Sequence, residues 1–96
     1  GSGSLSSYMP LSGGTFTGTV ITQHLRPANN AQFDLGSSSY RYDNIYTNDL
    51  HLSNQGKTND VDGSWGDWTI QEGESDLFLK NNRSGKKYKF NLTEIA

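Results

Sequence analysis

Residues 59–92 carry the sequence NDVDGSWGDWTIQEGESDLFLKNNRSGKKYKFNL, in which three short runs of strand-forming residues are separated by turns that contain glycine. The runs cover residues 68–72, 76–80 and 86–92. Short apolar and aromatic runs bounded by Gly, Asn, Asp and Ser predict β-strands. We therefore expect a tight antiparallel β-meander. It is too small and too polar to bury a core by itself, so its aromatic side chains need a cover from elsewhere.

The composition predicts an all-β fold with a thin core. Ser, Thr, Asn and Gly make up 40 of the 96 residues, whereas Ala and Glu, which favour helices, occur three times each. Leu, Ile, Val and Phe together number only 19, yet the net charge of −2 and the eleven aromatic residues argue against a disordered chain. Small domains with little apolar surface often complete their cores by oligomerisation.

The same composition argues against several classes of site and partner. The sequence has no cysteine, so we expect neither disulfides nor a thiolate zinc site. No run approaches the length of about 18 apolar residues that a membrane span needs, and the mild acidity disfavours nucleic acid as a partner. The basic cluster of residues 83–89 is interpreted as a solvated outer face. Residues 1–4, GSGS, are interpreted as a linker or an expression remnant.

The chain before residue 59 contains further strand-like patterns. Residues 15–22 alternate polar with apolar or small side chains, and residues 31–35, 40–46 and 49–53 form three more short runs. Leu50 and Leu52 share one face of the last run, and His51 takes the other. About seven short strands result, but most of them offer too few large apolar residues for a sealed monomeric core. Such strands suit an elongated assembly in which neighbouring copies supply the missing contacts.

Three motifs resemble parts of the tail fibres and tailspikes of tailed bacteriophages. Residues 8–18, YMPLSGGTFTG, resemble a short repeat that recurs along fibre shafts. Residues 35–46, LGSSSYRYDNIY, resemble a motif common near the distal ends of these fibres. Residues 59–63, 68–73 and 85–90 resemble a closing module of the same class of proteins. Together the motifs cover nearly the whole chain after residue 4.

The resemblance implies an elongated, intertwined homotrimeric β-structure, similar to a β-prism or a triple β-helix, that ends in the small meander. It divides the chain into a shaft-like segment (5–34), an intertwined trimeric segment (35–58) and the meander (59–96). The self-cleaving chaperone domain that often follows the second motif has no room in this sequence. We expect the trimer core to be formed by the apolar side chains of Phe16, Val20, Ile45, Tyr46, Leu50, Leu52, Trp68, Ile70, Phe78 and Phe90.

The resemblance also implies the function. It implies a distal fibre segment that trimerises and supports host attachment, located in the virion and made in the bacterial cytoplasm. The alternative is a receptor-binding tip that recognises a bacterial surface glycan or protein. Neither function uses a cofactor, and neither is enzymatic.

The carboxylates of the C-terminal third suggest two kinds of site, both of which have simpler explanations. A glycosidase needs two carboxylates about 5 to 10 Å apart across a sugar, which a sequence cannot show. An EF-hand calcium loop needs carboxylates where Thr58 and Thr69 stand, so that motif fails. A calcium site of another kind at Asp60 and Asp62 stays a weak alternative to ordinary turn hydrogen bonding. No catalytic residue is predicted.

Aromatic residues near Asp and Asn are the chemistry that sugar-binding sites use. Trp65 lies between Ser64 and Gly66 in a turn, so we expect an exposed ring there. Trp68, Tyr46, Phe78 and Phe90 stand in strand patterns and are interpreted as core, and His24 and His51 as surface residues. The candidate receptor-binding residues are therefore Trp65, Asp62, Asn59 and Asp67.

Overall fold

The structure is a computed structural model that describes residues 11–96. The predicted linker at residues 1–4 and the first three residues of the shaft-like motif, Tyr8 to Pro10, lie outside the described part. Contacts divide the chain into two units between Tyr40 and Arg41, and all the strands belong to the second unit. Nothing in residues 11–96 forms a helix long and apolar enough to cross a membrane.

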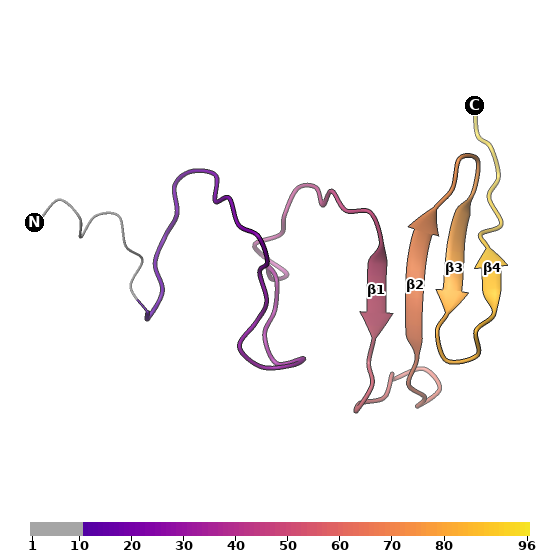
Figure 1. Cartoon of the computed structure of the whole chain (residues 1–96), viewed down its shortest axis with the longest axis horizontal. Coiled ribbons are helices and arrows are strands. Elements are labelled where there is room, and N and C mark those ends of the chain that lie inside the picture. The colour runs from indigo at the N-terminus through magenta and orange to yellow at the C-terminus, as the bar shows by residue number, and fades with distance from the viewer. Residues whose placement is uncertain (1–10) are drawn as a thin grey trace, which may run out of the picture. The chain divides into compact units, whose positions relative to one another are not determined.

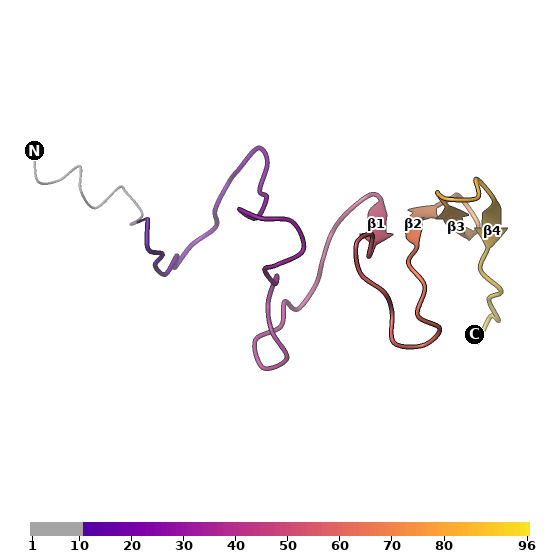
Figure 2. The same ribbon diagram turned by 90° about the horizontal axis from the view of Figure 1, so that it is seen from below.

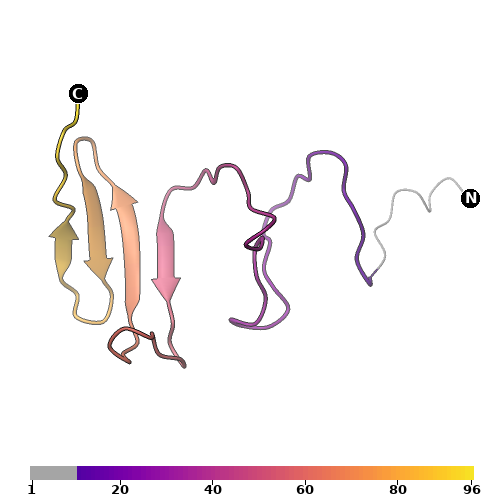
Figure 3. The same cartoon turned by 180° about the vertical axis from the view of Figure 1, so that it is seen from behind.

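The second unit is built on one four-stranded antiparallel sheet with the strand order β1-β2-β3-β4 (Figure 1). Its strands are β1 (Leu50–Ser53), β2 (Asp67–Glu72), β3 (Leu77–Asn81) and β4 (Lys87–Lys89). Each strand pairs with the next one along the chain, as Figure 3 also shows from the other side. The predicted all-β class and the predicted meander are therefore confirmed, with β1 as a further strand of the same sheet.

The pairing register separates the side chains of the sheet into two faces. Leu52 lies opposite Trp68, Leu50 opposite Ile70, and Ile70 in turn opposite Leu79. Residues directly opposite one another on paired strands point to the same face. The hydrogen bond from the Phe90 N–H to the Leu77 carbonyl, 3.0 Å long, continues this register past β4. One face, called the apolar face below, consequently carries Leu50, Leu52, Trp68, Ile70, Leu77, Leu79, Tyr88 and Phe90.

The opposite face, called the polar face below, carries the alternate residues of each strand, among them His51, Thr69, Gln71, Lys80, Lys87 and Lys89. Phe78 also belongs to the polar face, because it lies opposite Gln71 and Lys89. Phe78 therefore does not share a face with Trp68 and Ile70, and its expected place in a trimer core stays a prediction. The run Leu77-Phe78-Leu79 is apolar throughout, so alternation alone could not decide which face the ring takes.

The sheet has no covered core within residues 11–96. Thr69, at 3% exposure, is the only buried residue among them, and no apolar side chain is buried. Leu50, Leu52 and Tyr88 on the apolar face keep 45%, 47% and 46% of their surface exposed. A contact between the rings of Trp68 and Tyr88, whose centroids lie 5.9 Å apart, is the main aromatic packing on this face. An apolar sheet face is normally buried against a second layer, and residues 11–96 do not bury this one.

Residues 11–49 contain no strand, so the strands predicted at residues 15–22, 31–35 and 40–46 are not present in the single chain. A strand requires a neighbour for its N–H and C=O groups, and these runs find no partner within their own chain. The apolar side chains that the sequence places in a trimer core are accordingly exposed here. The exposed fraction is 61% for Phe16, 51% for Val20, 72% for Ile45 and 93% for Tyr46.

Candidate functional site

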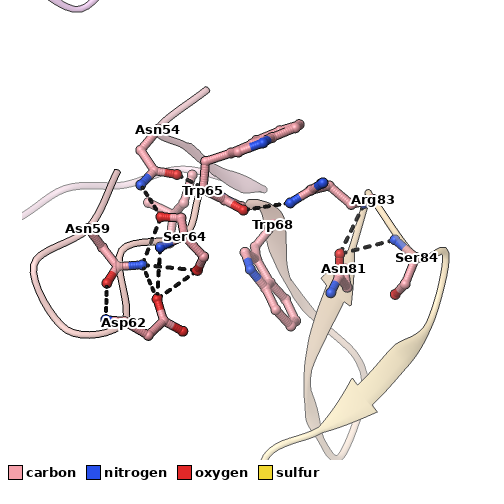
Figure 4. A pocket seen from close by; sticks show the side chains of 11 residues that line it. Asn54, Asn59, Asp62, Ser64, Trp65, Trp68, Asn81, Arg83 and Ser84 are labelled. Atoms are coloured by element: carbon pink, nitrogen blue, oxygen red, sulfur yellow. Dashed lines mark hydrogen bonds between the residues drawn. The ribbon is translucent and has the colours of Figure 1, made fainter. Parts of the chain in front are cut away.

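An open groove of about 700 Å³ lies at the end of the sheet where two connections meet (Figure 4). One is the loop of residues 54–66 between β1 and β2, and Figure 2 shows it leaving the plane of the sheet to one side. The other is the turn of residues 82–86 between β3 and β4. Leu52 and Trp68 add the end of the apolar face to the wall of the groove. The groove therefore joins polar loops to the uncovered face of the sheet.

Asn59 organises the first loop through both ends of its side-chain amide. Its Oδ1 accepts hydrogen bonds from the N–H groups of Val61 and Asp62, at 2.8 and 2.9 Å. Its Nδ2 donates to Asp62 Oδ1 at 2.8 Å and to the Ser64 carbonyl at 2.9 Å. Gly63 closes the turn at φ 73°, a conformation that glycine adopts without steric cost. The loop is therefore a compact, internally bonded turn, as the interpretation of its acidic residues as turn formers predicts.

Asp62 is held by the same network. Its Oδ1 accepts from the Ser64 hydroxyl at 2.7 Å and from the Ser64 N–H at 3.1 Å. These bonds, led by the one from the hydroxyl and joined by the one from the Asn59 amide, lower the pKa of the Asp62 carboxyl below its ordinary value. The carboxyl remains exposed to solvent. Among residues 11–96 it is the only carboxylate that lines the groove.

Asn54 fastens the two ends of the loop to each other. Its N–H donates to the Gly66 carbonyl at 3.3 Å, and its Oδ1 accepts from the Gly66 N–H at 2.7 Å. Gly66 also allows the close approach of Trp68, because a Cβ at this position would lie 2.9 Å from the indole Nε1. These contacts set where the chain enters β2 and hence where Trp65 and Trp68 stand in the groove.

Trp65 and Arg83 connect the two sides of the groove. The Arg83 guanidinium carbon lies 3.8 Å from the centroid of the Trp65 ring, and its Nη1 donates to the Trp65 carbonyl at 2.9 Å. Asn81 shapes the turn that presents Arg83, since its Oδ1 accepts from the N–H groups of Arg83 and Ser84. Trp65 is consequently half-buried, and the prediction of an exposed ring is wrong. The cation covers one face of the ring, a favourable stacking geometry.

The structure brings three of the four predicted receptor-binding residues together. Asn59, Asp62 and Trp65 line the groove, whereas Asp67 lies on the polar face and accepts a hydrogen bond from Asn82 Nδ2 at 3.1 Å. Arg83 was not among the predicted site residues, although its place in the Asn-Arg-Ser-Gly turn is a signal that could have drawn attention to it.

The structure also shows the surroundings of Asp62, considered above as a calcium ligand, and of His51. Asp62 keeps its hydrogen bonds within the turn, and no group of three or more metal-ligating side chains lies together in the part of the chain described. His51 is exposed on the polar face, as predicted, and its Nδ1 lies 3.0 Å from the Thr69 hydroxyl oxygen. Asn82 Nδ2 donates to the same oxygen at 2.9 Å, so the Thr69 hydroxyl lies within hydrogen-bonding distance of both side chains.

Comparison of the chain with protein-family models, with curated proteins and with solved structures finds no match.

Proposed function

We propose that the chain is a structural segment near the distal end of a phage tail fibre, and that three copies associate to complete one core. The observation that carries the proposal is the apolar face of the sheet, which eight large side chains line and nothing in the described chain covers. Full burial of one such side chain contributes about 1.5 to 3 kcal/mol. Eight partly exposed side chains per copy therefore provide a strong drive for association.

The segment before the sheet supports the same assembly. Residues 15–22 have the alternation of a half-buried strand, yet Phe16 and Val20 are largely exposed and no partner strand is present. Neighbouring copies would supply both the hydrogen-bond partners and the apolar cover. Three copies around one axis form a closed symmetric assembly in which every copy covers the next, and the three resembling motifs favour three over two.

Two aspartate substitutions on neighbouring residues test whether the apolar face holds the copies together. Leu50→Asp introduces a carboxylate on the apolar face, whereas His51→Asp introduces the same charge on the polar face. We expect Leu50→Asp to dissociate the trimer and His51→Asp to leave it intact in sedimentation velocity. A trimer that survives Leu50→Asp would refute the apolar face as its interface.

A second candidate function is contact with a host-surface receptor through the groove. The observation in its favour is that Asn59, Asp62 and Trp65 line one groove, with Arg83 stacked on the indole. This arrangement offers an aromatic ring, amide groups and both signs of charge, as sugar-binding sites do. Leu52 and Trp68 in the wall also belong to the apolar face, so association of copies would narrow the groove from that side.

Binding of the purified chain to intact bacterial cells tests the second function. Trp65→Ala removes the ring from the groove, and Tyr40→Ala is the matched control, because its ring is exposed, lies outside the groove and is not among the expected trimer-core residues. We expect Trp65→Ala to lose cell binding while it keeps its oligomeric state. Equal binding by both variants would remove the groove as the contact site and leave the structural role.

A further inference from the structure

A second hollow, of about 440 Å³, lies on the polar face over β3 and β4. Three lysines line it together with Phe78 and Tyr88, and Tyr88 belongs by its register to the apolar face. Lys80 lies directly opposite Lys87, and Phe78 directly opposite Lys89. Gln71 adds an amide from β2. These residues, Gln71, Phe78, Lys80, Lys87 and Lys89, are called the lysine patch below.

The charges of the lysine patch have no ion-pair partners in the part of the chain that the structure describes. Within residues 11–96, none of the three ammonium groups forms an ion pair. Like charges directly opposite on paired strands destabilise a sheet, so the pair of Lys80 and Lys87 carries a cost. Lysines on an edge strand protect it from pairing, which accounts for Lys87 and Lys89 on β4. It does not account for Lys80, which is half-buried on the inner strand β3.

Phe78 is the second unexplained feature of the patch. The ring is 38% exposed on a face that is otherwise polar, although the apolar face lies one residue away on either side. Gly73 allows the ring to lie close to the turn between β2 and β3, because a Cβ on that glycine would lie 2.5 Å from Phe78 Cε2. An aromatic ring therefore lines the same hollow as three cations.

We infer that the lysine patch binds an acidic saccharide. A sugar ring has an apolar face that can pack on Phe78, and its carboxylate or sulfate groups would neutralise the opposed lysines with charge-assisted hydrogen bonds. Gln71 supplies an amide for a hydroxyl group. Each feature of the patch, namely the opposed cations, the exposed ring and the amide, corresponds to one chemical group of such a ligand.

The charges around the lysine patch favour a short acidic saccharide over a nucleic acid as its ligand. Asp49, which accepts from Gln71 Nε2 at 3.1 Å, and Asp67 lie on the same face towards β1. The cations therefore span only β3 and β4. A single-stranded nucleic acid needs a positive track along its backbone, and these two carboxylates interrupt it. The inference does not depend on the trimer, because the patch lies on the face opposite the proposed interface.

Calorimetric titration with three probes of similar length tests the ligand class. Hexagalacturonate is an acidic saccharide, maltohexaose is a neutral one, and a six-nucleotide oligothymidylate is a polyanion with aromatic bases. We expect the full chain at low salt to bind hexagalacturonate and to bind maltohexaose at least tenfold more weakly, or not at all. Absence of hexagalacturonate binding would overturn the inference, and so would tighter binding of the oligonucleotide.

Substitutions then locate the site. Lys80→Gln and Lys87→Gln should each weaken hexagalacturonate binding by about three- to tenfold, the loss of one solvent-screened charge-assisted contact. Lys86→Gln is the matched control, since it removes the same charge next to Lys87 and lies outside the patch. Equal weakening by the control would show that net charge alone drives binding. Phe78→Leu, with sedimentation to verify the unchanged assembly, should weaken binding of the same probe, and unchanged binding would exclude the ring from the site.

Discussion

Substitution of Leu52 by Ala is the sharpest energetic test of a covered apolar face. Leu52 keeps 47% of its surface exposed in the single chain, so about half of its burial energy is still to be gained on association. In an uncovered sheet, the substitution should cost about 1 kcal/mol, roughly half of the 1.5 to 3 kcal/mol for a fully buried leucine. Beneath a neighbouring copy, it should cost about 3 kcal/mol per chain, as substitutions of buried leucine by alanine do.

Guanidinium unfolding at several protein concentrations measures this cost. Val61→Ala is the control, because Val61 is 91% exposed in the loop and its loss should change the unfolding free energy by less than about 0.5 kcal/mol. We expect Leu52→Ala to lower the unfolding midpoint strongly and to make it more dependent on concentration, because association and folding are linked. A loss of about 1 kcal/mol with no dependence on concentration would refute the reasoning.

Two further predictions concern the turns. Gly73→Ala should destabilise the chain by about 1 to 3 kcal/mol, since the new Cβ would lie 2.5 Å from Phe78 Cε2, and the same substitution combined with Phe78→Ala should recover most of the loss in thermal unfolding. A double variant no more stable than Gly73→Ala would exclude the ring as the cause. Hydrogen bonds, led by the one from the Ser64 hydroxyl, lower the pKa of the Asp62 carboxyl in the folded chain. The ionised carboxylate therefore stabilises the fold at pH values above the unfolded pKa of about 3.9. This stabilisation is lost as the pH falls through the lower pKa of the folded state. Asp62→Asn should therefore lose less stability than the unsubstituted chain between about pH 5 and pH 2, and parallel pH profiles would contradict the assignment.

The sequence predicted the sheet well where strands find partners within the chain. The runs at residues 49–53, 68–72 and 76–80 correspond to β1, β2 and β3 within one residue at each end, and β4 lies inside the run at residues 86–92. Glycine and asparagine in the turns fix these limits, as Gly85 does at φ 77° after β3. Alternation also placed Leu50 and Leu52 on one face and His51 on the other.

The features that the sequence did not predict depend on contacts between distant segments, which a pattern of apolar and polar residues does not specify. Residues 15–22 have the composition of a strand, but a strand forms only where a second one accepts its hydrogen bonds. Phe78 took the polar face because the pairing of β2 with β3, and not the ring's own hydrophobicity, sets the register. The stacking of Arg83 on Trp65 joins two turns that are 18 residues apart, a distance at which sequence spacing carries no signal.

The mass of the purified chain in solution tests the central claim most directly. Sedimentation equilibrium requires no ligand, no host and no substitution. If the apolar face is covered by two further copies, the measured mass should be three times the chain mass of 10.6 kDa and should stay constant over a wide range of concentration. A folded species of 10.6 kDa, with the sheet intact by circular dichroism, would contradict the claim.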